Sequence, residues 1–387
     1  MKLFGYKRED GSFGIRNHIL VIPASVCAAD TAAKIARQVA GAISISNQHG
    51  CCQIGDDYAV TERTLVGYGK NANVGAVLVV GLGCEGIQAK ELADLIKVSK
   101  KQVEYIVIQE EEGTLKTISK GVKILREMSE SVSLQRREEF DISHLIVGLE
   151  CGGSDPTSGI ASNPAIGMAS DKICQMGGST ILSETTEVIG AEHILAKRFL
   201  DEKEKEKFLK FVNDTETRAL SLGEDLRDGQ PTPGNKEGGL TTIEEKSLGC
   251  MHKAGSSLFV GSLEYSERVH NDKKGLYFMD SPGQDIDSIT GMVASGAQII
   301  LFSTGRGTPT GNPIAPVIKI TGNPDTYKMM EDNIDMNMGK IITDGASLED
   351  MGNELFEKIE KVANVMKTKA EILGHKEFGI FKVSGTF

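Results

Sequence analysis

Short apolar segments recur along the chain, and in its first half each is followed by a helix-prone segment. Three lie before residue 130 and three after it: HILVIPA (18–24), NVGAVLVVGLG (73–83), YIVIQ (105–109), HLIVGLE (144–150), QIILFS (298–303) and PVIKI (316–320). Continuous apolar strands that alternate with amphipathic helices are typical of a parallel sheet covered on both faces. The alternation therefore predicts an α/β fold.

A polar stretch, SESVSLQRREEFD (129–141), separates the two sets of apolar segments and is expected to be a linker. A chain of 387 residues ordinarily divides into two or three domains. We therefore predict one α/β domain over residues 1–132 and a second over residues 133–387. Both are expected to be parallel-sheet, Rossmann-like domains, with a cleft between them at the C-terminal ends of the strands.

Charge and hydropathy narrow the class of partner. The formal net charge is −11 and no sustained basic block is present, which argues against nucleic acid and anionic membranes as partners. No apolar run approaches the roughly 18 residues of a membrane span. The start of the chain, MKLFGYKREDGSFG, has no apolar signal-peptide core, so a cytoplasmic location is expected. A small anionic substrate stays open, because a few local basic residues can hold one.

Cysteines follow several of the apolar segments. Seven in a chain of this length are too few for a disulfide scaffold, and no CxxC pair is present. Cys27, Cys51, Cys84 and Cys151 each come after an apolar segment. Ligands of open α/β sheets bind outside the carboxyl ends of the strands, so these thiols are expected to converge.

A fifth cysteine, Cys250, follows a predicted short helix that begins at Thr242, has Glu245 at capping-box spacing and ends at Gly249. Thiolates beside glycines suit iron or an iron–sulfur cluster. The alternative is that these cysteines are small buried hydrophobic residues, which is common for free cysteine.

Polar side chains occupy similar loops. Arg306 lies between two glycines in STGRGTPTGNP (303–313), a loop that also contains Thr308, and a guanidinium there suits a carboxylate. The alternative is a surface turn shaped by glycine and proline. His49 and His252 lie next to Cys51 and Cys250, so they are candidate ligands or proton carriers.

The stretch GLGCEG (81–86) formally matches the G-x-G-x-x-G of dinucleotide sites. Glu85 would stand at the helix N-terminus, where its carboxylate would compete with the cofactor phosphates for the backbone donors. Dinucleotide binding is therefore the weaker interpretation of this loop.

Six longer motifs carry a resemblance to a known family. They are GYKREDGSFGIRNHILVIP, GCCQIGDD, NVGAVLVVGLGCEG, GLECGGSDPTSGI, PGNKEGGLTTIEEKSLGC and ILFSTGRGTPTGNPIAPVIKI. They resemble the altronate dehydratase / galactarate dehydratase family from about residue 5 to the C-terminus. Five cysteines fall on motif positions, whereas Cys52 and Cys174 do not.

The resemblance implies an iron-dependent hydro-lyase that converts a sugar acid, such as altronate or galactarate, into a 2-keto-3-deoxy acid. Manganese is the alternative metal. The large subunit of sulfolactate sulfo-lyase is similar, so removal of sulfite from sulfolactate is the alternative reaction. A non-catalytic binding or scaffold homologue is the alternative from another class.

Two departures from the family pattern bear on the site. Members often have histidine at the position of Asn47, which puts the role of the Cys51 loop in doubt. Full-length dehydratases begin with a small SAF-type domain that is not found here, so the resemblance implies a separate small subunit of that type. A homo-oligomer is left open.

These arguments assign roles to individual side chains. The expected metal ligands are Cys84, Cys151, Cys250 and Cys51. The expected substrate-binding residues are Arg306, Ser154, Asp155 and Thr308. The candidate catalytic bases are Lys253, His252 and His49, unless a partner subunit supplies the base.

Overall fold

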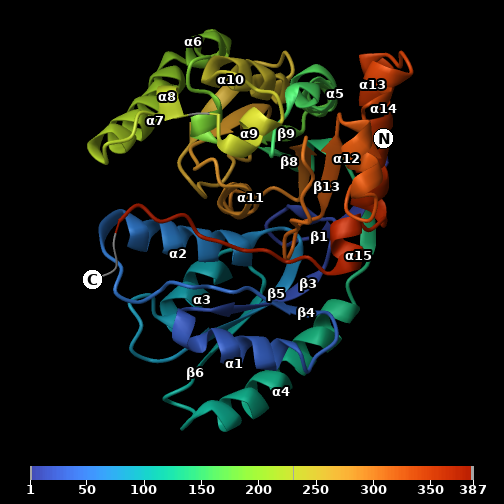
Figure 1. The fold of residues 1–387 in the computed structure, drawn as a ribbon. Helices are drawn as coiled ribbons and strands as arrows, with labels where there is room; N and C mark the ends of the chain where they lie inside the picture. The colour runs from blue at the N-terminus through green and yellow to red at the C-terminus, as the bar shows by residue number, and fades with distance from the viewer. Residues whose placement is uncertain (1, 230, 385–387) are drawn as a thin grey trace.

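A computed structural model describes residues 2–229 and 231–384 and contains two parallel sheets, as the apolar segments predict (Figure 1). The first sheet has the order β4 (Ala42–Ser44), β3 (His18–Pro23), β5 (Val74–Gly81) and β6 (Gln102–Val107). Its helices are α1 (Val26–Ala36), α2 (Gly55–Lys70), α3 (Ala89–Lys97) and α4 (Thr114–Ser133). Helices α1 and α4 cover one face and α2 and α3 the other, so both faces of these apolar strands are buried.

The second sheet has seven parallel strands. Their order is β10 (Phe259–Leu263), β11 (Leu276–Met279), β9 (Ser179–Leu182), β8 (Ile146–Gly152), β12 (Ile299–Thr304), β13 (Val317–Thr321) and β14 (Met336–Asn337). The α-helices of this half are α5 (Asn163–Gln175), α6 (Glu192–Leu195), α7 (Glu202–Ser221), α8 (Leu226–Gly229), α9 (Pro233–Glu237), α10 (Ile243–Met251), α11 (Asp285–Ala294), α12 (Pro324–Met329), α13 (Lys340–Thr343), α14 (Leu348–Asn364) and α15 (Lys369–Leu373).

Each sheet has a point where successive strands are added on opposite sides of its first strand in the chain. In the second sheet β8 is followed by β9 on one side, and the chain later crosses to β12 on the other side of β8. In the first sheet β3 lies between β4 and β5 in the same way. Ligands of open α/β sheets bind outside the carboxyl ends of the strands at such switch points. Ligand-binding residues are therefore expected in the loops after β8 and β12 and in those after β3 and β5.

The expected linker is structured. Helix α4 continues to Ser133, and β7 (Arg137–Phe140) pairs antiparallel with β1 (Leu3–Lys7), which also pairs with β2 (Phe13–Gly14). Phe140 is buried opposite Leu3, which explains why a largely polar segment forms a strand.

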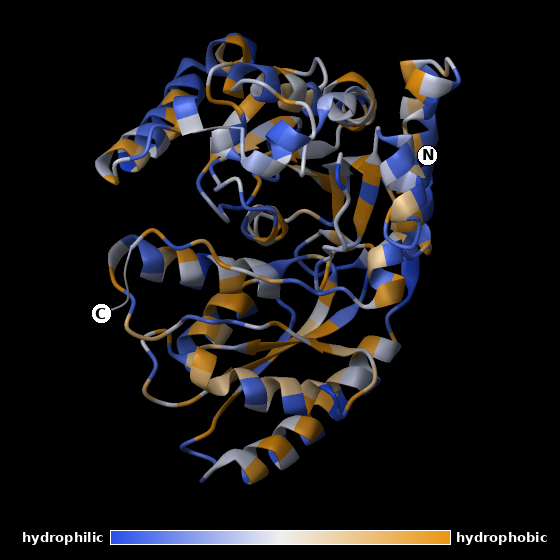
Figure 2. Ribbon diagram, in the orientation of Figure 1, coloured by the Kyte–Doolittle hydropathy of each residue, from blue (hydrophilic) through white to orange (hydrophobic). Residues whose placement is uncertain are grey.

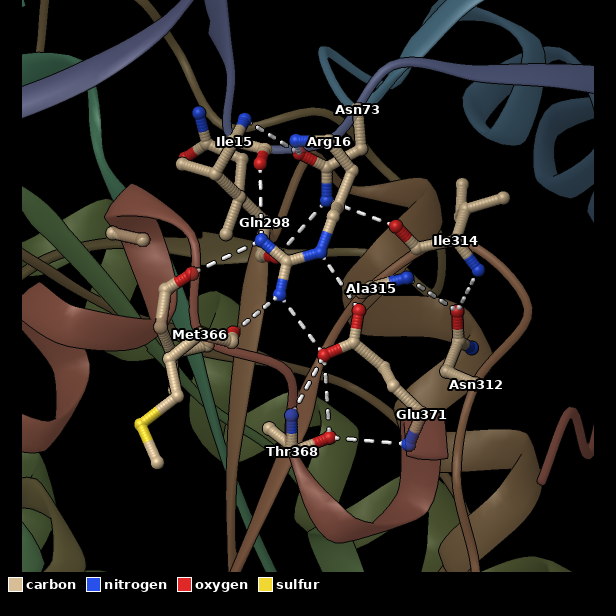
Figure 3. Close-up of polar contacts among 12 residues, drawn as sticks. Ile15, Arg16, Asn73, Gln298, Asn312, Ile314, Ala315, Met366, Thr368 and Glu371 are labelled. Atoms are coloured by element: carbon tan, nitrogen blue, oxygen red, sulfur yellow. Dashed lines mark hydrogen bonds and ion pairs between the residues drawn. The ribbon is translucent and has the colours of Figure 1, made fainter. Parts of the chain in front are cut away.

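The C-terminal segment also contacts elements of the first half of the chain. The Arg16 guanidinium makes a bidentate ion pair with Glu371 of α15, at 2.7 and 2.9 Å (Figure 3). The backbone N–H groups of Val383 and Ser384 donate to the Asp57 carboxylate on α2. The end of the chain therefore ties the two halves together, an interaction between residues more than 300 positions apart.

Hydropathy follows this layering. The strands of both sheets are largely hydrophobic, whereas α7 is mostly hydrophilic (Figure 2). In α7 only Phe208, Phe211 and Val212 are buried, which agrees with a solvated helical face. Among residues 2–229 and 231–384, no helix is both long and apolar enough to cross a membrane.

Candidate functional site

Two buried cysteines meet at the switch point of the second sheet. Cys151 stands near the end of β8 and Cys250 in the last turn of α10, and their Sγ atoms are 3.2 Å apart. Thr242 caps α10 through its Oγ1, as predicted, but the helix continues through Gly249 instead of ending there. Gly249 lies in close contact with Gly159, so its role is to let α10 approach that turn. We call Cys151 and Cys250 the thiol pair.

Glu184 completes a group of three ligand atoms with the thiol pair, all within 4.8 Å of one another. It follows β9 with φ 71°, a left-handed conformation that is costly for a residue with a Cβ. Its Oε2 accepts hydrogen bonds from Lys253 Nζ at 3.1 Å and from the backbone N–H of Cys151 at 3.2 Å. The Glu184 and Lys253 side chains are both fully buried, so this is an ion pair shielded from water.

Two further carboxylates lie against Glu184. Ligand oxygens of Glu150, Glu184 and Asp285 are all within 4.8 Å of one another, and we call these residues the carboxylate group. Burial, followed by the charge of Glu184, raises the pKa of Glu150 well above its usual range. Burial, with Glu184 and Glu187 nearby, raises the pKa of Asp285 to about 7. The centre is therefore richer in acidic groups than in cations.

Lys253 is the fully buried cation of this centre. Burial by itself lowers its pKa, but Cys151, Cys250 and Glu184 have the opposite effect and the net pKa is raised well above the usual value. The ammonium form is therefore held at neutral pH. A lysine that serves as a general base needs a lowered pKa, so this environment suits electrostatic stabilisation better than proton abstraction.

The donor set fits a thiophilic divalent metal. The hydrogen bond to Cys250, followed by burial, raises the pKa of Cys151 well above its usual value, so the metal-free thiol keeps its proton. A metal ion displaces such protons because it binds the thiolate form. Glu184 Oε1 is buried and has no hydrogen-bond partner among the described residues, which leaves it available as an oxygen ligand.

Two cavities flank the thiol pair. The Arg306 cavity, about 360 Å³, is lined by Cys151, Gly152, Gly153, Ser154, Glu187, Thr232, Gly234, Asn235, Lys246, Gly283, Asp285 and Arg306. The His252 cavity, about 200 Å³, includes Cys250 and His252. Ser154 and Lys246 line both cavities, so the two adjoin. Every residue that lines either cavity belongs to the second half of the chain.

The predicted substrate-binding residues are only partly brought together. Arg306 and Ser154 line the Arg306 cavity, and the N–H of Arg306 donates to Gly153 O at 3.0 Å, which joins the loops after β8 and β12. Asp155 lines the His252 cavity, but its carboxylate already accepts hydrogen bonds from the backbone and hydroxyl of Ser158 and from Asn323. Thr308 lines neither cavity, and its hydroxyl bonds to that of Thr310.

The predicted bases lie in three different settings. Lys253 is inside the centre as a buried ammonium. His252 is exposed and lines the cavity beside Cys250. His49 lies in the first half of the chain, where its Nε2 is 3.4 Å from Ile380 O, and burial lowers its pKa. It lines neither cavity.

Cys51 and Cys84 do not join the thiol pair. Cys84 is exposed after β5, and Cys51 is partly exposed after β4. Neither belongs to a metal-like group within 4.8 Å among the described residues, and neither lines the two cavities. The order of the strands explains this, because Cys51 and Cys84 follow strands of one sheet and Cys151 follows a strand of the other.

The GLGCEG loop does not present free donors to a pyrophosphate. Glu85 Oε2 accepts hydrogen bonds from the N–H groups of Leu82 at 3.0 Å and Gly83 at 2.6 Å. The carboxylate thus occupies the position that a dinucleotide would need, as its place in the sequence suggested.

Several residues of the centre escape sequence reasoning. Glu150 precedes Cys151 directly, yet it reads as part of an apolar strand. Glu184 stands in no cysteine motif, and Asp285 ends DSPGQD, a loop that is weak evidence alone. Their common signal is position at a strand end or helix end. That signal has meaning only once the strand order is known.

Comparison with known proteins covers both halves of the chain. Residues 142–386 match the family described as D-galactarate/altronate dehydratase, C-terminal, and residues 5–133 match D-galactarate dehydratase/altronate hydrolase, second domain. The chain is 38% identical over 377 residues to (2R)-sulfolactate sulfo-lyase subunit beta of Chromohalobacter salexigens, covering 97% of this chain and 95% of the relative. It is 34% identical to the altronate dehydratases of Bacillus subtilis and Escherichia coli, covering 98% and 97% of this chain and 77% of each relative. The chain therefore belongs to the galactarate/altronate dehydratase family and is a lyase of that family.

Proposed function

We propose that the chain is the large, metal-binding part of a lyase that removes water from a sugar acid such as altronate or galactarate and yields a 2-keto-3-deoxy acid. One observation carries the proposal: the thiol pair and Glu184 meet at the switch point of the second sheet, beside a cavity that also presents Arg306. A hydroxy acid bound there has its carboxylate near a guanidinium and its reacting carbons near the centre.

Iron is the proposed metal, held by Cys151, Cys250 and Glu184, with manganese as the alternative. When bound, iron supplies a Lewis acid that stabilises charge on the carboxylate and on the leaving hydroxyl. The 3.2 Å separation of the two Sγ atoms would let both thiols of the pair bind the same metal ion. Cys51 and Cys84 stay proposed ligands only if a different arrangement brings them in.

The side chains of this chain have separate tasks in the proposal. Arg306 holds the substrate carboxylate, since it lines the cavity and is cationic, and Lys246 lines the same cavity while its ammonium pairs with Glu187 at 2.7 Å. Ser154 contacts the substrate hydroxyls from the position where the two cavities adjoin. Lys253 stabilises negative charge that develops at the centre. Of the three candidate bases, His252 is favoured because it lines a cavity next to Cys250.

Removal of sulfite from sulfolactate is the second candidate reaction. The observation that favours it is the extent of the match: this chain covers 95% of the sulfo-lyase subunit beta, against 77% of each altronate dehydratase. Because this relative is a subunit beta, a separate partner is also supported, which we propose to be a small SAF-type subunit. A cytoplasmic location belongs to the same proposal.

A non-catalytic scaffold is disfavoured because the centre destabilises the fold. Burying Lys253, Glu150 and Glu184 together has a large desolvation free energy, and replacing buried ion pairs by apolar residues is often neutral or stabilising. A protein selected only for binding has no need of such a group.

The test uses anaerobically purified full-length chain, loaded with Fe²⁺ and assayed with and without a co-expressed small subunit. Substrates are a panel of aldonates, aldarates and sulfolactate, with keto-acid and sulfite as separate readouts. Keto-acid from a sugar acid supports the first proposal, and sulfite release supports the second. No bound metal and no product from any substrate refutes both.

A further inference from the structure

The carboxylate group gathers oxygen atoms next to the thiol pair. Ligand oxygens of Glu150, Glu184 and Asp285 lie within 4.8 Å of one another. Glu184 also belongs to the thiol-containing group, so the two groups share one residue. One set of donors is thus sulfur-rich and the other consists of oxygen alone.

The hydrogen bonds of the two glutamates leave one oxygen of each unused. Glu150 Oε2 accepts from Ser288 Oγ at 2.6 Å, and Glu184 Oε2 accepts from Lys253. The other oxygen of each, Oε1, is buried and accepts no hydrogen bond from an N–H or hydroxyl group within the described part of the chain, and the two carboxyls lie close enough to share a proton. Both residues are fully buried, so these oxygens are not solvated either. A buried carboxylate oxygen without a partner is unfavourable unless a cation or a proton occupies the site.

The surroundings orient these oxygens in three ways. Ser183 Oγ bonds to Ser288 Oγ at 2.8 Å, and Ser288 in turn fixes Glu150. Gly152 has no side chain where Asp285 lies: a Cβ there would be 2.4 Å from Asp285 Oδ2. Glu184 keeps its left-handed backbone, a cost that persists only where the surroundings impose it. Outer-shell hydrogen bonds of this kind are what hold metal-binding carboxylates in place.

We infer that Glu150, Glu184 and Asp285 form a second cation site, which takes a hard divalent ion such as Mg²⁺ or Mn²⁺ next to the thiol site. Oxygen-only donor sets select such ions, whereas the sulfurs of the thiol pair select softer ones. Asp285 lines the Arg306 cavity, so water can complete the coordination from that side. Glu184 would be common to both sites. The inference extends the proposed metal centre but does not depend on which reaction it catalyses.

Metal binding at the two sites is measured with two different ions, each added to the metal-free full-length chain. Mn²⁺ alone is titrated and the free ion is followed by electron paramagnetic resonance. The titration is made in a Cys151→Ser/Cys250→Ser background, so that the thiol site does not contribute. Co²⁺ alone reports the thiol site in the wild-type background through its thiolate charge-transfer absorption.

We expect the double-serine chain to bind one Mn²⁺, and Glu150→Gln or Asp285→Asn to weaken that binding at least about tenfold, as loss of a metal partner does. The Co²⁺–thiolate band should persist in Glu150→Gln and Asp285→Asn and disappear in the double-serine chain. Glu85→Gln is the matched control, because Glu85 is also buried with one unpartnered oxygen but belongs to neither group of three.

Failure of Mn²⁺ to bind the double-serine chain overturns the inference and indicates that residues of the carboxylate group share a proton instead. Binding that is unchanged by both Glu150→Gln and Asp285→Asn overturns it as well. If Co²⁺ gives no thiolate absorption band with the wild-type chain, the thiol site is refuted and the oxygen site is not affected. Should Glu150→Gln not fold, Asp285→Asn decides, since Asp285 lies at the cavity edge in the first turn of α11.

Discussion

The two switch points of this molecule use similar residues with opposite results. Both place a glycine, a cysteine and a buried glutamate at the end of a strand: Gly81, Cys84 and Glu85 after β5, and Gly152, Cys151 and Glu150 at the end of β8. In the first, the cysteine is exposed and the glutamate accepts backbone hydrogen bonds. In the second, the cysteine is buried against Cys250 and the glutamate lies against two other carboxylates. Similar residues at a strand end therefore serve structure in one sheet and form the proposed metal centre in the other.

The largest expected contrast is between the cysteines of the two sites. Cys151→Ser or Cys250→Ser should lower metal content and reduce kcat/KM at least about 100-fold, the upper end of the loss seen even for outer-shell partners of a metal. Cys84→Ser should leave metal content unchanged, because Cys84 lies outside the group. Metal analysis and anaerobic kinetics check this. Equal metal loss in Cys84→Ser would break the comparison and restore the four-cysteine site.

Arg306 tests whether the second switch point binds an anion. Arg306→Ala should raise KM by roughly 10- to 100-fold, since a hydrogen bond to a charged group contributes about 1.5–3 kcal/mol. Arg306→Lys should recover only part of this, because lysine cannot make the bidentate contact. Steady-state kinetics with the identified substrate give both values. An unchanged KM in Arg306→Ala would show that the loop is only a surface turn.

Two strand-end glycines offer a matched pair for packing. A Cβ at Gly152 would meet Asp285 Oδ2 at 2.4 Å, and a Cβ at Gly81 would meet Glu85 Oε1 at 2.3 Å. Each change to alanine should destabilise the fold by about 1–3 kcal/mol, as overpacking does. Only Gly152→Ala should also weaken Mn²⁺ binding. Thermal unfolding and Mn²⁺ titration separate these effects, and equal Mn²⁺ affinity in the two variants would contradict the difference.

The smallest expected effect is an opposite pH response of the two halves. Burial, followed by the charge of Arg16, lowers the pKa of His18 to about 4, so the unfolded chain binds the extra proton below pH about 6.5 and stability falls on acidification. Asp285, with its pKa raised to about 7, is protonated in the folded state while ionised in the unfolded state. Its contribution therefore destabilises the metal-free fold as the pH rises from about 4 to 7.

His18→Asn should thus raise the melting temperature relative to wild type at pH 5 more than at pH 7.5, by a few degrees for about 1–2 kcal/mol. Measured in the presence of a chelator, Asp285→Asn should raise the melting temperature relative to wild type more at pH 7.5 than at pH 5. Calorimetry at both pH values measures the two differences. The same pH trend in both variants would argue against distinct environments at the two sites.

Most of the fold follows from the sequence pattern. HILVIPA, NVGAVLVVGLG, HLIVGLE and QIILFS form or contain strands, and the helix start at Thr242 is seen as predicted. The predicted end of that helix at Gly249 was wrong, because Gly249 lies in contact with Gly159, a residue distant in sequence. The expected linker forms a strand for the same kind of reason, since Phe140 pairs with Leu3 at the start of the chain.

The sequence by itself determined that five cysteines stand at strand or helix ends, that Arg306 lies in a glycine-bounded loop and that Glu85 competes with any phosphate. These are local features, set by the periods of strands and helices and by the hydrogen bonds of adjacent residues. The tertiary structure decided which cysteines meet, because the order of strands in each sheet depends on packing between distant segments. It alone brought Glu184, Lys253 and Asp285 to the ends of β8 and α10, where burial gives ordinary side chains their unusual charge states.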